Sequence, residues 1–395
     1  MKRLPLLLLS LALLLGLLPT PAYAVPVGGL TWAPDPVASG ATAEQPCADL
    51  LFVGARGSGE QAPYGPTVTT VRDQLVGQTA APQGTPTGTV RQVYLDYPAT
   101  APQVLLTLGL DKLLFNDPLP ANAYTDSVAT GVTRLSEVLA DSRARCPGER
   151  WVLAGFSQGA QIVNEVIAGL PGTEGTDRLA GAVLVGNPAH YAGQRLTRLG
   201  DSTETSTGLM PSLYYLREAA AQARQQGQFG PVAAALAAKQ LGDGSADTAQ
   251  LSSIATRYRY AVGGDTARMF TVCASGDLVC DSGAGLWRVL TNAVTVDQEL
   301  SRTRPIHGGY TGEQLAPATA AIGQYLRDTL PEAPPAPVPP VLPWVIGGGV
   351  VLALVVAALL VLRARRRTAA AGDSAAGTGP QSDGSAPIDR TRVGQ

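Results

Sequence analysis

The stretch that decides the fold is "WVLAGFSQGAQIV", residues 151–163. A continuous apolar run stops at Gly155, and an amphipathic run begins at Gln158. Ser157 stands between them, at the centre of the pattern G-x-S-x-G. A strand that ends in this pattern and leads straight into a helix is the context of a nucleophile elbow, a sharp turn that exposes a serine at a sheet edge. A serine that merely caps a helix is the plainer alternative.

Four further apolar runs share the length and the Gly and Pro boundaries of the first, which is typical of buried parallel strands. With the first run, they cover residues 49–55, 90–98, 150–155, 179–188 and 268–273. Helical patterns separate them; Tyr124, Val128 and Leu135, for example, fall on one helical face. Alternating strands and helices predict an α/β fold with a central five-stranded parallel sheet covered on both faces.

A nucleophilic serine needs a base, and the base needs an acid that orients it. The chain has two histidines. His307, in the predicted glycine-flanked loop "RPIHGGY", is the predicted base. His190 follows a strand too closely to leave room for an acid before it, so we expect it in a surface loop or near the site mouth. Asp277 in "CASGDLVCD" is the predicted acid because it follows the strand that ends at Cys273, and Asp281 is the alternative.

The four cysteines all lie in the part of the chain that we expect to be exported. They are Cys47, Cys146, Cys273 and Cys280. An even number in that setting predicts two disulfides, for which three pairings exist. Their sequence proximity favours Cys273 with Cys280, which leaves Cys47 with Cys146. The spacings fit no zinc pattern, and we expect neither a metal nor a cofactor.

The two ends of the chain predict export and membrane attachment. A basic start, a leucine-rich run and an A-x-A site indicate a cleaved signal peptide. A late uncharged apolar run has the length of a bilayer span, and the arginines after it favour a cytoplasmic tail. A sorting tail that is later removed is the alternative. The predicted organisation is a signal peptide at 1–24, a flexible segment at 25–45, a catalytic domain at 46–330, a Pro-rich stalk at 331–343, a transmembrane helix at 344–362 and a cytoplasmic tail at 363–395.

The charge balance excludes one class of partner. The formal net charge is −2, so the chain has no nucleic-acid signature. The expected partners are an ester or lipid substrate and the plasma membrane, which would hold a monomeric extracellular domain through the late apolar helix.

Four segments together resemble the cutinase family of serine esterases, in a membrane-anchored form of actinobacterial type: "CADLLFVGARGSGE", "LAGFSQGAQIV", "CASGDLVC" and the late "IHGGY". The resemblance runs in pieces from Cys47 to about residue 330. It implies a three-layer α/β/α hydrolase fold and the disulfide pairs named above. The implied catalytic triad is Ser157, Asp277 and His307. The implied oxyanion hole is the backbone N–H of Gln158 together with Ser58 in "ARGSGE".

The chain departs from compact members of that family in a long helix-prone insertion at about residues 190–266. It emerges on the side of the sheet where the site opens, as either a lid or acyl-chain surface or a decoration without a catalytic role. Leu213, Tyr214, Tyr215 and Leu216 form an apolar patch within it, for which we expect contact with the hydrolase body or a lipid-like substrate.

These observations predict an extracellular serine esterase that hydrolyses lipid-type or cutin-like carboxylic esters through an acyl-enzyme. An acetylxylan-type polysaccharide esterase and an envelope acyltransferase are the enzymatic alternatives. A non-catalytic surface protein that binds lipid or wall polymer is the alternative of another class.

Overall fold

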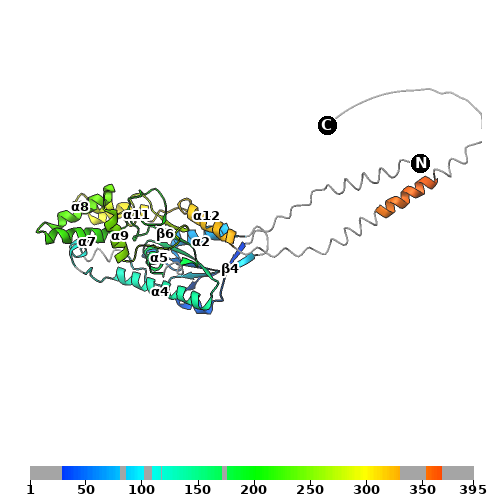
Figure 1. The fold of residues 1–395 in the computed structure, drawn as a ribbon, viewed down its shortest axis with the longest axis horizontal. Coiled ribbons are helices and arrows are strands. Elements are labelled where there is room, and N and C mark those ends of the chain that lie inside the picture. Colours follow the sequence, from blue (N-terminus) through cyan, green and yellow to red (C-terminus); the bar gives the residue numbers. More distant parts are fainter. Residues whose placement is uncertain are drawn as a thin grey trace, which may run out of the picture. The chain divides into compact units, whose positions relative to one another are not determined.

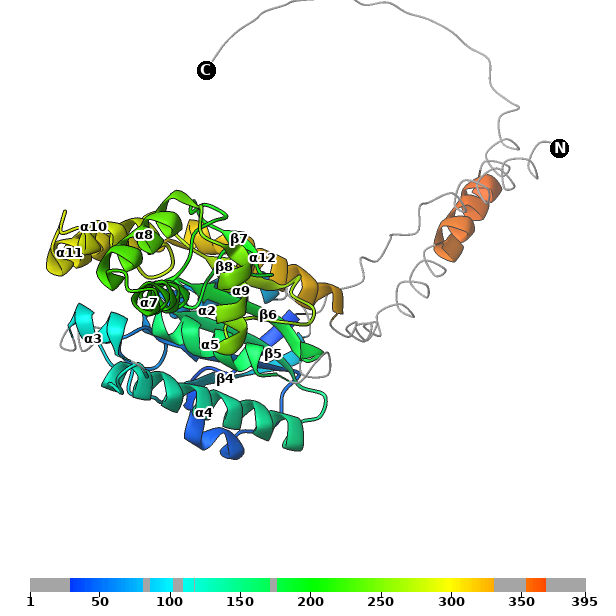
Figure 2. The same cartoon turned by 60° about the vertical axis from the view of Figure 1, so that its left-hand side comes forward.

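The computed structural model describes residues 29–80, 86–101, 109–116, 118–170, 176–329 and 353–366. The predicted signal peptide and Pro-rich stalk lie outside these residues, as do parts of the predicted N-terminal segment, membrane span and cytoplasmic tail. The chain divides into two units, Met1–Pro334 and Pro335–Gln395. The first unit holds the α/β domain (Figures 1 and 2).

A parallel sheet forms the centre of this domain. Within the described residues it has eight strands, in the order β1-β4-β3-β5-β6-β8-β7, with β2 paired to β4. Every recorded strand pair is parallel. The strands are β1 (Gly29–Trp32), β2 (Val37–Ala38), β3 (Leu50–Ala55), β4 (Pro86–Tyr94), β5 (Arg150–Phe156), β6 (Leu179–Val185), β7 (Thr197–Leu199) and β8 (Met269–Val272).

The five predicted strands correspond to β3, β4, β5, β6 and β8, which lie next to one another in the middle of the sheet. The prediction of five strands in all is wrong, because β1, β2 and β7 add short strands at the edges. β1 and β2 belong to the predicted flexible segment at 25–45, whose described part is regular and includes the 3₁₀ helix η1 (Ser39–Glu44). β1 and β2 are strands because they pair with β4, and the local composition gives no sign of this pairing.

Helices cover both faces of the sheet, as predicted. On one face α4 and α5 pack against side chains such as Leu51 and Val53 of β3. On the other, α2 and α12 pack against Leu50 and Phe52 of the same strand. This alternation follows from the two-residue period of a strand, and it gives three layers. The helices of the first unit are α2 (Gly65–Thr79), α3 (Leu110–Phe115), α4 (Ala123–Arg145), α5 (Gln158–Ala168), α7 (Leu209–Gln225), α8 (Gly230–Asp243), α9 (Thr248–Arg257), α10 (Gly283–Leu290), α11 (Val296–His307) and α12 (Gly312–Thr329).

The region predicted as an insertion forms α7, α8 and α9 and the edge strand β7. Helices α3, α7, α8, α10 and α11 gather beyond one end of the sheet (Figure 2), and α7 and α10 follow strands in the chain. The predicted apolar patch packs inward: Tyr215 and Leu216 are buried, while Leu213 and Tyr214 are half-buried against the same helices. These four residues therefore contact the protein itself. The start of α7 is also tied to the acid-bearing loop, since Leu209 N–H donates to the Val279 carbonyl at 2.9 Å.

Both predicted disulfides are present. Cys47 joins Cys146, and Cys273 joins Cys280. The first bond links the segment before β3 to the end of α4. The second closes a short loop directly after β8, and this loop carries the predicted catalytic acid.

The second unit contains a described helical segment at residues 353–366. The predicted membrane span at 344–362 begins outside the described residues. Among the residues that are described, no helix has both the length and the apolar character needed to cross a bilayer.

Candidate active site

Ser157 occupies a strained turn between β5 and α5. Its backbone has φ 53° and ψ −119°, a region that residues other than glycine rarely enter. The turn is fixed from both sides, because Ser157 N–H donates to the Val185 carbonyl at 2.9 Å and its own carbonyl accepts from Gln161 N–H at 3.1 Å. The serine is half-buried at the helix N-terminus. This is the geometry of a nucleophile elbow.

The two glycines of the pattern are required by close backbone approach. A Cβ on Gly155 would lie 2.5 Å from the Gly159 carbonyl oxygen. A Cβ on Gly159 would clash with the Ala55 carbonyl oxygen at the end of β3. A side chain at Gly155 would therefore collide with the first turn of α5, and one at Gly159 would push the elbow away from the end of β3.

The predicted base and acid are hydrogen-bonded to each other. His307 Nδ1 lies 2.8 Å from Asp277 Oδ2. A carboxylate only accepts, so Nδ1 carries the proton and Nε2 is left as an acceptor for a serine hydroxyl. Asp277 is fully buried, whereas the His307 side chain is 19% exposed. His307 is the last residue of α11 rather than part of a loop, and Gly308 caps that helix.

His307 lies beside the serine elbow. Its ring stacks on Phe156, the residue before Ser157, with 4.9 Å between ring centroids and 25° between planes. Gly186, directly after β6, allows this position: a Cβ there would lie 2.9 Å from His307 Cε1. The sequence reading did not single out Gly186, although a glycine at the end of a buried strand is a signal of close approach.

Tyr310 is a further member of the site that the sequence reading missed. Its hydroxyl donates to Asp277 Oδ2 at 2.6 Å and accepts from Ala274 N–H at 3.1 Å. Burial, followed by the Asp277 charge, raises the pKa of Tyr310 well above its usual value. Together with Val279 N–H, which donates to Asp277 Oδ1 at 2.9 Å, it fixes the carboxylate. The tyrosine stood in the quoted segment "IHGGY", but nothing local indicated its partner.

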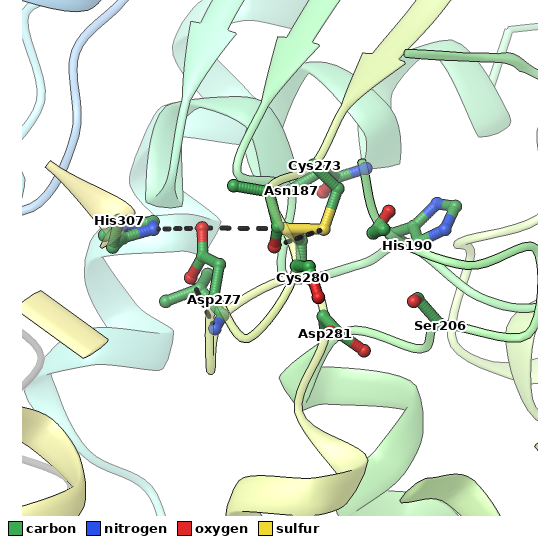
Figure 3. The surroundings of a disulfide bond; sticks show 12 residues. Asn187, His190, Ser206, Cys273, Asp277, Cys280, Asp281 and His307 are labelled. Carbon is green, nitrogen blue, oxygen red and sulfur yellow. Dashed lines mark hydrogen bonds and ion pairs between the residues drawn. A yellow bond between two sulfur atoms is a disulfide. The ribbon is translucent and has the colours of Figure 1, made fainter. Parts of the chain in front are cut away.

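The alternative base and acid lie elsewhere (Figure 3). His190 is 1% exposed, so its placement in a surface loop is wrong. Its Nε2 accepts from Arg198 at 2.8 Å and its Nδ1 faces Gln194 Oε1 at 3.0 Å. Burial, with the Arg198 charge, lowers its pKa to about 3, so it is neutral. Asp281 Oδ2 accepts from Gly276 N–H at 2.8 Å, and it points away from His307.

Both predicted oxyanion residues carry a buried side-chain atom that has no hydrogen-bond partner among the described residues. Ser58 Oγ is a buried atom without a hydrogen-bond partner among the described residues. Gln158 is fully buried at the first position of α5, where backbone N–H groups have no acceptor within the helix. Its side-chain Oε1 accepts from Ser127 Oγ at 3.1 Å, while its Nε2 is unpaired within the described part of the chain.

The loop that carries Ser58 is braced by Arg56. This buried guanidinium donates to the carbonyls of Leu95 and Tyr97 at 2.9 and 2.5 Å, and to the Glu60 carbonyl at 3.0 Å. The Tyr97 hydroxyl donates back to the Arg56 carbonyl at 2.5 Å. Because a buried charge is tolerated only when it is fully bonded, this network gives the loop one conformation.

The arrangement brings a strained serine, an imidazole whose Nδ1 is bonded to a buried carboxylate, and the candidate oxyanion donors Ser58 and Gln158 to one edge of the sheet. In the described residues, no group of three or more His, Cys, Asp or Glu is arranged to hold a metal ion. The chemistry available is nucleophilic attack by a hydroxyl with proton transfer through an imidazole.

Comparisons with known proteins agree on one family. The cutinase family model matches residues 46–292, more than half of the chain. A cutinase of Botryotinia fuckeliana is 30% identical over 150 residues, which is 38% of this chain and 62% of that protein. The match thus spans less than two thirds of that relative's length.

Solved structures also give matches, at low identity. A cutinase-like protein from Cryptococcus sp. is 17% identical over 70% of this chain and 94% of its own, with a TM-score of 0.38. The catalytic core domain of acetyl xylan esterase from Trichoderma reesei is 17% identical over 71% of this chain and 98% of its own, also with a TM-score of 0.38.

Proposed function

The chain belongs to the cutinase family, and we propose that it is a carboxylic ester hydrolase that works through an acyl-enzyme on Ser157. One observation carries the proposal: the strained serine elbow lies beside an imidazole that is hydrogen-bonded to a buried carboxylate. Strain at a single non-glycine residue persists only where the surrounding structure enforces it, and it clusters at functional sites.

In the proposed mechanism, His307 Nε2 takes the proton of the Ser157 hydroxyl as the oxygen attacks the ester carbonyl. Asp277 holds the imidazole in the required tautomer and stabilises the imidazolium that forms. The imidazolium then protonates the departing alcohol. A water attacks the acyl-enzyme by the same route, and the carboxylic acid leaves.

The negative charge of each tetrahedral intermediate would be stabilised by the Gln158 backbone N–H and by Ser58. The N-terminus of α5 adds its dipole to these donors. Donors of this kind, aimed at the developing oxyanion, each lower the activation free energy by about 2.7–4 kcal/mol. Ser58 Oγ has no hydrogen-bond partner among the described residues, which supports this role because none of those bonds must be broken before it acts.

We propose lipid-type esters as the substrate class. Phe229, Val232 and Leu236, at the start of α8, are 71%, 54% and 53% exposed. Their spacing places them on one helical face, and large apolar side chains gathered on a surface favour contact with an apolar partner. This stripe belongs to the predicted insertion, which supports the insertion as an acyl-chain surface rather than a decoration.

The extracellular location and the attachment to the plasma membrane are also proposals. Their support is the predicted signal peptide and the apolar run followed by arginines. Protease added to intact cells should remove the catalytic domain and spare the tail; a domain that stays protected would contradict this orientation.

The activity is tested with p-nitrophenyl esters from acetate to palmitate. Wild type should hydrolyse them, and Ser157→Ala should fold normally while losing about four or more orders of magnitude in kcat/KM. Phe229→Ser should lower the turnover of long chains more than that of acetate.

Turnover restricted to acetate would favour the acetyl esterase alternative, and transfer to an added alcohol in preference to water would favour the acyltransferase. Binding of lipid without turnover would favour the non-catalytic alternative.

A further inference from the structure

Within the described parts of the chain, no hydrogen bond fixes the direction of the Ser58 hydroxyl. Ser58 Oγ is buried and has no hydrogen-bond partner among the described residues. A donor in this state is aimed only by its rotamer and by the backbone that carries it. The residues that shape the backbone around Ser58 therefore decide whether the hydroxyl points at the oxyanion.

Glu60 closes that backbone into a tight turn. Its carboxylate Oε2 accepts from Gly57 N–H at 2.6 Å, and its own N–H donates to the Gly57 carbonyl at 3.2 Å. Its carbonyl accepts from Arg56 Nε at 3.0 Å. Ser58 lies inside the turn that these bonds close.

The Glu60 carboxylate is itself held in place. It lies against Gly65, the first residue of α2, where a Cβ would come within 2.5 Å of the Glu60 carboxyl carbon. Gly65 has φ +69°, a conformation that favours glycine. The missing side chain also leaves room for the Glu60 carboxylate. The N-terminus of α2 also favours a carboxylate at this place.

Gly57 donates its N–H to the Glu60 carboxylate and also contacts Phe156, the residue before Ser157. A Cβ on Gly57 would lie 2.6 Å from Phe156 Cδ1, and Phe156 is the ring that stacks on His307. The turn therefore lies between the Glu60 carboxylate and Phe156, with close contacts to both. A small change at Glu60 would move Ser58 relative to Ser157.

We propose that Glu60 is a positioning residue of this esterase, whose carboxylate holds Gly57 N–H and thereby aims the Ser58 hydroxyl at the oxyanion. The inference rests on the proposed function. Burial raises the pKa of Glu60, while the Gly57 N–H and the charges of His307 and Arg56 oppose that rise. The role itself needs an acceptor oxygen and not a charge, because an amide or a protonated carboxyl also accepts from Gly57 N–H.

That distinction sets the first test, which compares Glu60→Gln with Glu60→Ala. The glutamine variant keeps an acceptor oxygen and should retain kcat within about threefold, as a conservative rescue. The alanine variant should lose about 10- to 100-fold in kcat with little change in KM, because a misplaced oxyanion donor weakens only the transition state. Equal losses in both variants would overturn the proposal. If the alanine variant does not fold, Glu60→Asp replaces it, since the shorter side chain withdraws the acceptor.

A double-mutant cycle with Ser58→Ala supplies the decisive readout. If Glu60 acts through the Ser58 hydroxyl, Glu60→Ala should cost less than about threefold when that hydroxyl is already absent. The same loss in both backgrounds would show that Glu60 acts elsewhere and would overturn the inference. Thermal unfolding of each variant distinguishes a general loss of stability from a displacement of the Ser58 hydroxyl alone.

The role of Glu60 and the proposed esterase activity can be refuted separately. An additive cycle in an enzyme that hydrolyses p-nitrophenyl esters overturns only the role of Glu60. A wild-type protein that hydrolyses no ester overturns the proposed function and, with it, this inference.

Discussion

The acid–base half of the site and its oxyanion half differ in how fully their polar atoms are bonded. In the acid–base half, Asp277 accepts from His307, Tyr310 and Val279. In the oxyanion half, Ser58 Oγ has no partner among the described residues, and the surrounding loop is held instead. The first half is saturated before substrate arrives, and the second keeps its donors free.

The chemistry of the two halves explains the difference. The Asp277 carboxylate is fully buried, so unpaired oxygens would cost about 1–3 kcal/mol or more each. The oxyanion exists only briefly, and a donor that was already bonded would have to exchange partners when the charge appears. In the proposed mechanism, the acid–base half therefore maintains the tautomer of His307, and the oxyanion half donates to the charge that develops in the transition state.

The largest effect within this comparison is expected for Asp277→Asn. An amide in place of the carboxylate can donate to His307 Nδ1, which stabilises the wrong tautomer and places the proton on Nε2. We expect kcat to fall about 10⁴-fold, measured with a short-chain p-nitrophenyl ester. Asp281→Asn in the same loop is the matched control and should lose no more than a few-fold. Equal losses in the two variants would remove Asp277 from the site.

Ser58→Ala should produce the next largest loss. It removes one hydroxyl that has no hydrogen-bond partner in the described part of the chain, so the thermal midpoint should barely change. We expect kcat to fall about 100-fold, the lower end for a lost oxyanion donor, because the backbone N–H groups remain. Thermal scanning and steady-state kinetics on the same preparations give both quantities. A variant that loses stability but not activity would contradict the assignment of Ser58 to the oxyanion half.

Tyr310→Phe should have the smallest effect on kcat and a clear effect on stability. It deletes one of three donors to Asp277 and leaves Ala274 N–H without an acceptor. A hydrogen bond to a charged group contributes about 1.5–3 kcal/mol, of which we expect part to appear as a roughly 10-fold fall in kcat. Tyr325→Phe on α12 removes a hydroxyl outside the site and serves as the control. If Tyr310→Phe changed neither kcat nor the stability, Asp277 would not need the Tyr310 hydroxyl as a donor.

Local signals account for what could be predicted from the sequence. Ser157 stood out because a buried strand, a G-x-S-x-G pattern and a helix follow one another within a few residues. Asp277 could be favoured over Asp281 because it follows the end of a strand closely. These are local signals, and a parallel sheet brings the carboxyl ends of its strands to one edge.

The parts that were missed depend on contacts between distant segments. Tyr310 reaches Asp277 across 33 positions of sequence, and no local pattern encodes that pairing. The edge strand β1 lies in Gly-rich and Pro-rich sequence and is ordered by β4. Glu60 escaped notice because a glutamate beside glycines is ordinarily a solvated loop residue; its role depends on Gly57 and on the close approach of Gly65.

The central claim, that Ser157 is the nucleophile, is tested most directly by a fluorophosphonate probe followed by peptide mass mapping. The account predicts one phosphonyl group per chain, attached to the peptide that contains Ser157. It predicts no labelling of Ser157→Ala and much slower labelling of Asp277→Asn, because the base is then in the wrong tautomer. Stoichiometric labelling of a different residue, or an unlabelled protein that still hydrolyses esters, would contradict it.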